Sequence, residues 1–295
     1  MSEKIKVIID TDIGSDIDDA LCLAYMLSEP RFEILGITTC SSEPWKRAEI
    51  ADSICRAAGK SIPIFVGRDK PMRVEQKQTA VHQYSVVKSL PHAVYPKENY
   101  AIGFMNDMIK KHPGEVVVLA IGPLTNIGVL FSEHPELAAQ VRAVATMGGV
   151  FSERENLSST REWNIVNDPH AADIVFKSDA QILIAGLEVT LKTKTSAKDF
   201  LRHEHSGIMK TVAMYTQKFT DRTDDMYYHD VIPAAMLVEG DIAKLKRGFV
   251  NIDLQNEVGK TKFTESKHGN AFVIYDFDEK RFFEAFKSAI SGYST

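Results

Sequence analysis

The densest group of potentially reactive side chains is an acidic loop near the start of the chain. Five carboxylates fall within ten residues, in the stretch Asp10-Thr11-Asp12-Ile13-Gly14-Ser15-Asp16-Ile17-Asp18-Asp19. Carboxylates this close repel one another and raise one another's pKa unless a cation neutralises them. A hard divalent cation prefers such oxygen ligands, and Gly14 allows the backbone to turn sharply around it. The loop therefore predicts a metal site.

A second interpretation of the same loop needs no metal. Asp18 and Asp19 stand where a helix is predicted to begin, and carboxylates are favoured there because they accept from free N–H groups and offset the helix dipole. The other carboxylates would then lie in a solvated turn. That interpretation accounts for only two of the five acidic residues, so the metal site is favoured.

The elements that must position this loop follow from hydrophobic periodicity. Short apolar runs alternate with longer amphipathic stretches, which predicts an α/β fold with a mainly parallel central sheet flanked by helices. Ligands bind such sheets beyond the carboxyl ends of the strands, where Asp10, Thr39, Gly122 and Met147 fall. Strands are predicted at residues 5–9, 32–39, 62–66, 115–121, 141–147 and 181–185, and helices at 18–27, 46–58, 100–110, 124–131 and 169–176.

The remaining segments are consistent with one domain over residues 1–295. Residues 68–98 have no clear period and are expected to form a long surface excursion. Residues 192–228 are expected to form helices that cap the strand ends. Residues 248–276 alternate apolar and polar side chains, which predicts late strands, and a closing helix is predicted at 279–290.

The bulk composition excludes several classes of protein. A net charge of -5 gives no basic surplus for binding nucleic acid, and no apolar stretch is long enough to cross a membrane or serve as a signal peptide. The three cysteines, Cys22, Cys40 and Cys55, are odd in number and sit among apolar residues. They predict buried thiols and no disulfide framework, which fits a cytoplasmic location.

The acidic loop resembles the D-x-D-x-G-x-D-D signature of the inosine–uridine-preferring nucleoside hydrolase family, with two extra residues before the final pair. The resemblance implies that Asp12 binds Ca²⁺ and activates the attacking water. It also implies that Asp19 binds Ca²⁺ and that Asp18 grips the ribose hydroxyls. Because of the insertion, either Asp16 or Asp18 can occupy the ribose-binding place.

Two further segments resemble the same family. Gly122-Pro123-Leu124-Thr125-Asn126 is by itself a proline turn that opens a helix. The resemblance implies that the Thr125 carbonyl is a metal ligand. Met147-Gly148-Gly149 is followed by Asn156 and then by Glu162-Trp163-Asn164. By resemblance, Asn156, Glu162 and Asn164 bind the ribose hydroxyls. Trp163 replaces the usual phenylalanine and either packs below the sugar or belongs to the core.

The last resembling segment is Tyr227-Tyr228-His229-Asp230, which precedes an apolar helix. The resemblance implies that His229 protonates the departing base and that Asp230 is a metal ligand. Histidine suits an acid role because its pKa lies near neutrality. Glu43 follows the second strand and is a further possible ribose contact. His82 is either an active-site histidine or a surface residue.

The resemblance implies a calcium-dependent enzyme that hydrolyses the N-glycosidic bond of ribonucleosides. It also implies a homodimer or homotetramer, which the sequence itself does not fix. Two alternatives stay open. A D-x-D loop after the first strand also suits a phosphohydrolase in which Asp10 or Asp12 is the nucleophile. A non-catalytic nucleoside-binding protein on the same scaffold would keep the ribose site, although the presence of both Asp12 and His229 argues against it. The motifs do not select a base.

Overall fold

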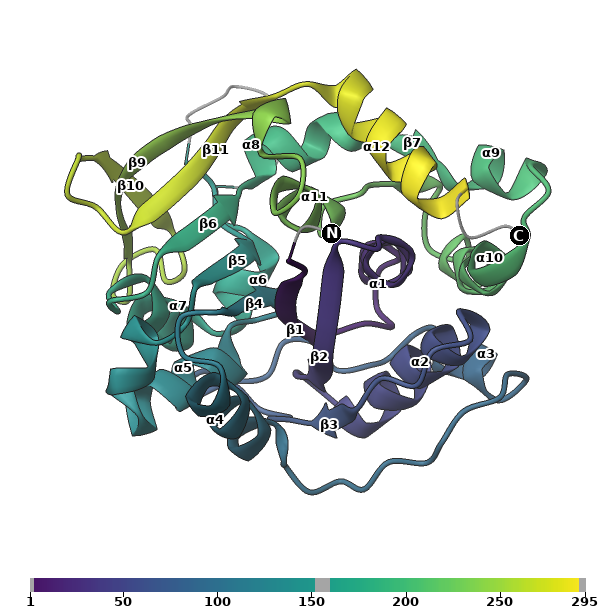
Figure 1. Cartoon of the computed structure of the whole chain (residues 1–295), viewed down its shortest axis with the longest axis horizontal. Coiled ribbons are helices and arrows are strands. Elements are labelled where there is room, and N and C mark those ends of the chain that lie inside the picture. Colours follow the sequence, from purple (N-terminus) through teal and green to yellow (C-terminus); the bar gives the residue numbers. More distant parts are fainter. Residues whose placement is uncertain (1–2, 152–159, 292–295) are drawn as a thin grey trace.

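The computed structural model describes residues 3–151 and 160–291. A nine-stranded sheet runs through the described residues in the order β10-β9-β11-β6-β5-β4-β1-β2-β3 (Figure 1). Six of its strands confirm the predicted ones: β1 (Ile5–Thr11), β2 (Phe32–Thr39), β3 (Ile64–Val66), β4 (Val116–Ala120), β5 (Ala143–Met147) and β6 (Ile182–Ala185). These six are mutually parallel wherever they pair. The sheet is completed by β9 (Ala243–Ile252), β10 (Thr261–Glu265) and β11 (Ala271–Phe277), of which β9 is antiparallel to both neighbours.

Helices cover both faces of the sheet, and β1 shows why. Its side chains alternate between two hydrophobic clusters, with Val7 and Ile9 in one and Ile8 in the other. The first cluster draws on α1 (Asp18–Ser28), α2 (Pro44–Ala57), α10 (Gly207–Phe219), α11 (Val231–Met236) and α12 (Glu279–Ser291). The second draws on α4 (Ala101–Lys111), α5 (Thr125–Glu133) and α7 (Pro169–Phe176). The predicted α/β fold with a mainly parallel sheet is confirmed.

Short elements connect these layers. They are α3 (Tyr84–Val87), α6 (Trp163–Asn167), α8 (Leu187–Thr190), α9 (Ala197–Arg202), three 3₁₀ helices (Pro135–Ala139, Leu191–Thr193 and Gly240–Ile242) and a small sheet of β7 (Thr195–Ser196) and β8 (Asp225–Met226). All three cysteines are buried, as predicted. None of the helices in the described ranges is long and apolar enough to cross a bilayer.

Two expectations about connecting segments were wrong in part. The excursion at residues 68–98 is not wholly a surface feature, because the side chains of Gln78 and Gln83 are buried. The sequence does not predict this burial, because the segment is polar and its apolar residues follow no regular period. In residues 192–228, α10 packs beside α1 and α2 instead of over the strand ends, because Val212 and Tyr215 belong to the hydrophobic core. Of that segment's described residues, Arg222 lines the cavity at the strand ends.

Candidate active site

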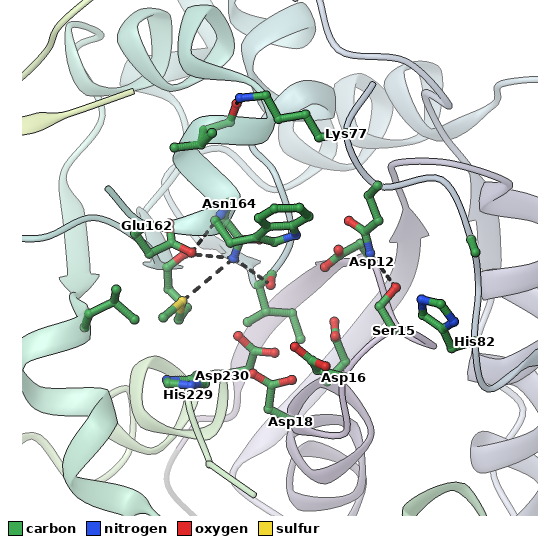
Figure 2. A pocket seen from close by; sticks show the side chains of 18 of the residues that line it. Asp12, Ser15, Asp16, Asp18, Lys77, His82, Glu162, Asn164, His229 and Asp230 are labelled. Atoms are coloured by element: carbon green, nitrogen blue, oxygen red, sulfur yellow. Dashed lines mark hydrogen bonds between the residues drawn. The ribbon is translucent and has the colours of Figure 1, made fainter. Parts of the chain in front are cut away.

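A cavity of about 690 Å³ opens beyond the carboxyl ends of the central strands. Figure 2 shows carboxylates from the acidic loop pointing into it from one side, with Glu162 and Asn164 on the other. The residues that line it come from seven separate parts of the chain: residues 12–19, 77–82, 161–166 and 222–230, and the single residues Ile121, Met147 and Leu187. The sheet therefore assembles in one place most of the side chains that the motifs singled out.

Three carboxylates form the tightest acidic group in the described part of the chain. Oxygen atoms of Asp18, Asp19 and Asp230 lie within 4.8 Å of one another. Asp18 and Asp19 begin α1, and Asp230 directly precedes α11, which packs against α1. Burial and the neighbouring carboxylates raise the pKa of all three. A hard divalent cation fits this group, because it offers several buried oxygen ligands whose mutual repulsion a positive charge would remove.

Asp12 lies at the end of β1, and its buried carboxylate also lines the cavity. Burial raises the pKa of Asp12, while the guanidinium of Arg47 and the nearby amide of Gln78 oppose that rise. Gly122 approaches this carboxylate so closely that an added Cβ would lie 2.8 Å from Asp12 Oδ1. The Gly-Pro-Leu-Thr-Asn segment therefore contacts the acidic loop directly.

Arg47 is a site residue that the motifs did not reveal. Its side chain is fully buried beneath the acidic loop. The guanidinium donates to the backbone carbonyls of Asp12 and Ile13, to Ser15 Oγ and, through Nε at 2.9 Å, to the carbonyl of Ser42. Only its position in the first turns of α2 places it there, and no local pattern in the sequence marks a buried arginine.

Asp10 lies outside the cavity and has a structural role. Its Oδ1 accepts hydrogen bonds from Thr38 Oγ1 at 2.5 Å and Asn126 Nδ2 at 2.7 Å, and it does not line the cavity. Burial raises its pKa to about 7. Thr125 is also buried, and its hydroxyl donates to Asp168 Oδ2 at 2.9 Å. The side chain of Thr125 is thus fixed at the start of α5.

Glu162 and Asn164 form the wall opposite the acidic loop. The Glu162 carboxylate caps α6 by accepting from the backbone N–H groups of Asn164 at 2.7 Å and Ile165 at 3.1 Å, and it also accepts from Gly149. Burial nevertheless raises its pKa to about 7. Trp163 is 53% exposed and lines the cavity, which excludes the core, one of its two predicted places. The predicted ribose contact Asn156 lies outside the described residues.

His229 borders the cavity next to Asp230, as Figure 2 shows. Its Nδ1 lies 2.7 Å from Thr190 Oγ1, and its ring stacks on Tyr227 with the centroids 4.8 Å apart. Burial lowers its pKa to about 4. The Thr190 hydroxyl occupies Nδ1, so Nε2 is the ring nitrogen that remains available to a ligand in the cavity.

The remaining predicted ribose contacts differ in position. His82 and Asp16 both line the cavity and both are exposed, and Asp16 pairs with Arg222 at 3.1 Å. Asp18 instead lies in the three-carboxylate group. Glu43 pairs with Lys46 ahead of α2 and is absent from the described cavity wall.

Comparison with known proteins agrees with this arrangement. The family model "Inosine-uridine preferring nucleoside hydrolase" matches residues 7–284. "Uridine nucleosidase 1" of Arabidopsis thaliana is 30% identical over 266 residues, which cover 85% of this chain and 79% of the relative. "Non-specific ribonucleoside hydrolase RihC" of Salmonella typhi is 31% identical over 268 residues, 87% of this chain and 86% of the relative.

The fold has close counterparts among solved structures. A "Purine-Preferring Ribonucleoside Hydrolase from Gardnerella vaginalis" superposes with a TM-score of 0.84 at 24% sequence identity, over 98% of this chain and 99% of the other. The family match covers all of the motifs from the acidic loop to Asp230. The chain therefore belongs to the inosine-uridine preferring nucleoside hydrolase family.

Proposed function

We propose that this protein hydrolyses the N-glycosidic bond of ribonucleosides and releases ribose and the free base. The observation that carries the proposal is the meeting, in one cavity, of the carboxylates of Asp12, Asp18, Asp19 and Asp230 with Glu162, Asn164 and His229. Acidic side chains suit a sugar-binding site whose transition state carries positive charge on the ribose. An aspartyl phosphohydrolase would leave Glu162 and His229 without a role.

We further propose that the cation is Ca²⁺. Asp12, Asp19 and Asp230 would hold it by their side chains, and Thr125 by its backbone carbonyl. The close group of buried oxygens around Asp19 supports this choice, because Ca²⁺ accepts many oxygen ligands in flexible geometry. When bound, such an ion supplies Lewis acidity, which orients hydroxyls and lowers the pKa of a water.

The side chains of the cavity have separate roles in this reaction. The carboxylate of Asp12 accepts a proton from the attacking water. Asp18, Glu162 and Asn164 bind the ribose hydroxyls, since a sugar presents donors and acceptors that must all be matched. The remaining carboxylates stabilise the positive charge that develops on the ribose as the C–N bond breaks.

His229 donates a proton to the departing base. Burial lowers the pKa of its ring to about 4, so the neutral ring prevails near pH 7. The proton comes from the small protonated fraction, whose Nε2–H passes it to the departing base and leaves the ring neutral. His82, on the opposite wall, is the second candidate for this role.

The direct test is a panel of purine and pyrimidine ribonucleosides incubated with the protein and Ca²⁺ and scored for free ribose. We expect release from at least one ribonucleoside, and a loss of several orders of magnitude for its 2′-deoxy counterpart, because a missing hydroxyl leaves buried polar groups unpaired. Both base classes belong in the panel, since relatives are described as uridine nucleosidases and as a purine-preferring hydrolase.

The controls separate this function from its alternatives. Asp19→Ala and exhaustive chelation should each abolish ribose release. Hydrolysis of p-nitrophenyl phosphate without ribose release would support the phosphohydrolase instead. Binding of a ribonucleoside without turnover would support the non-catalytic alternative. The buried free thiols are in keeping with a cytoplasmic enzyme, and we propose that it acts as a homo-oligomer, which sedimentation tests.

A further inference from the structure

A hydrogen-bonded amide beside Asp12 comes from the excursion at residues 68–98, which no motif covers. Gln78 is buried and lines the cavity, although its neighbours in sequence are exposed. Its Nε2 donates to Ser15 Oγ at 2.5 Å, and its amide lies near enough to the Asp12 carboxylate to lower the pKa of that group. Both partners belong to the acidic loop, and Figure 2 shows Asp12 and Ser15 on the same side of the cavity.

A third contact fixes which way the amide points. Ser41 Oγ donates to Gln78 Oε1 at 3.1 Å. A flipped amide would turn its oxygen toward the Asp12 carboxylate, where two acceptors would face each other. With the oxygen held by Ser41, both N–H groups face the acidic loop. Both hydrogen bonds of the Gln78 side chain are made in this orientation.

The backbone at Ser41 is unusual in a way that serves this contact. Ser41 has a φ of 69°, in the left-handed region that residues other than glycine seldom adopt. Glu43, two residues later, has a φ of 54°. This turn directs the Ser41 hydroxyl to Gln78 and leaves Glu43 outside the cavity wall. Strained residues of this kind cluster at functional sites, which supports a role for the turn.

We propose that Gln78 is a positioning residue for catalysis: its amide, held by Ser41 and bound to Ser15, keeps the acidic loop in the place from which the neighbouring Asp12 carboxylate takes a proton from the attacking water. This inference rests on the proposed hydrolase function. Gln78 acts through Asp12 rather than on the substrate. Its loss should therefore slow turnover more than it weakens substrate binding.

The test compares kcat and KM for ribonucleoside hydrolysis in Gln78→Met and Ser41→Ala. We expect kcat to fall about 10- to 100-fold in Gln78→Met with KM little changed, since a small misplacement of a catalytic group has effects of that order. Ser41→Ala should lower kcat by less. In the double variant, Ser41→Ala should add nothing to Gln78→Met, because Ser41 acts only through that amide.

Gln83→Met is the matched control. Gln83 is a second buried glutamine of the same segment, and its Nε2 donates to the backbone carbonyl of Asp16 at 2.9 Å. It should reduce thermal stability and leave kcat within a few-fold of wild type. Gln78→Asn, which keeps a polar amide, serves if Gln78→Met does not fold.

Three outcomes overturn the inference in a wild-type protein that releases ribose. They are an unchanged kcat in Gln78→Met, a rise in KM alone, which would make Gln78 a ribose ligand, and fully additive effects of the two substitutions. A wild-type protein that releases no ribose from any ribonucleoside contradicts the proposed function itself. The wild-type measurement therefore distinguishes the two failures.

Discussion

At the scale of single residues, the buried guanidinium of Arg47 is the cationic counterpart of the acidic loop. It binds two loop carbonyls, and its charge opposes the rise in the pKa of Asp12. We expect Arg47→Met to lower the free energy of unfolding by about 3–5 kcal/mol, because the carbonyls and the Asp12 carboxylate would stay buried without their partner. Urea unfolding of the metal-free protein measures this loss.

Arg47→Lys is the control for charge. A lysine keeps the positive charge but lacks the planar fork that reaches several acceptors at once. We expect it to recover part of the lost stability. Equal stability of the wild type and Arg47→Met would show that the loop holds its shape without this side chain.

A second prediction at this scale concerns His229. If it protonates the departing base, its contribution to kcat depends on how much that base needs a proton. His229→Ala should lose about 10²–10⁴ in kcat on natural ribonucleosides and largely keep its activity on p-nitrophenyl riboside, whose leaving group needs little help. Steady-state kinetics on both substrates tests this. Similar losses of kcat on both substrates would mean that His229 only supports the fold or the metal site. His82 would then be the next candidate for the acid.

At the scale of elements, Glu162 joins a helix end to the ribose site. Its carboxylate caps α6 through two backbone N–H groups and also lines the cavity. We expect Glu162→Ala to cost about 0.5–2 kcal/mol of stability through the lost cap and also to abolish most of the activity. Thermal unfolding and ribose release measure the two effects separately.

Ser196→Ala is the matched change at a helix end away from the cavity. Ser196 caps α9 by accepting from the backbone N–H of Asp199 at 3.0 Å. It should lose stability and keep its activity. Full activity in Glu162→Ala would mean that Glu162 is only a cap.

The sequence predicts these elements unevenly, for a physical reason. Local periodicity and local charge predict β1, β2, β4, α1 and the acidic loop. The motifs around Glu162 and Asp230 are short enough to be recognised locally as well. Arg47, Gln78 and Thr190 join the site only through contacts across 35, 63 and 39 positions of chain. The turn that removes Glu43 from the cavity wall depends on backbone angles that its residue types disfavour.

At the scale of the whole molecule, stability should depend on pH through the acidic cavity. Burial raises the pKa of Asp10 and Glu162 from 3.8 and 4.5 to about 7, and raises that of Asp12, Asp18, Asp19 and Asp230 as well. Between the unfolded and folded pKa values, the folded state keeps protons that the unfolded state has released. Its stability is therefore greatest at the acidic end of this window and falls as pH rises. His229, whose pKa is lowered to about 4, opposes this trend.

We therefore expect the melting temperature of the chelated protein to fall as pH rises from about 5 to 8. Ca²⁺ should reverse the trend, because it binds the ionised carboxylates, and its stabilisation should grow with pH. Thermal scans at several pH values with chelator or with Ca²⁺ test both statements. A chelated protein that becomes more stable toward pH 8 would contradict the raised pKa values of the cavity carboxylates.

The strand order also sets when, during folding, the cavity comes into being. β1 pairs with β2 on one side and with β4 on the other, so Ile8 lies opposite both Gly36 and Val118. Residues from Asp12 to Asp230 must then meet at the ends of these strands. Pairings of such long range form slowly, and chains of this size commonly fold through intermediates. A nascent chain emerging from the ribosome can build β1 and α1 early. It nevertheless carries five exposed carboxylates and has no complete cavity until α11 has been synthesised. During refolding, the recovery of ribose release should therefore trail the recovery of helix and sheet.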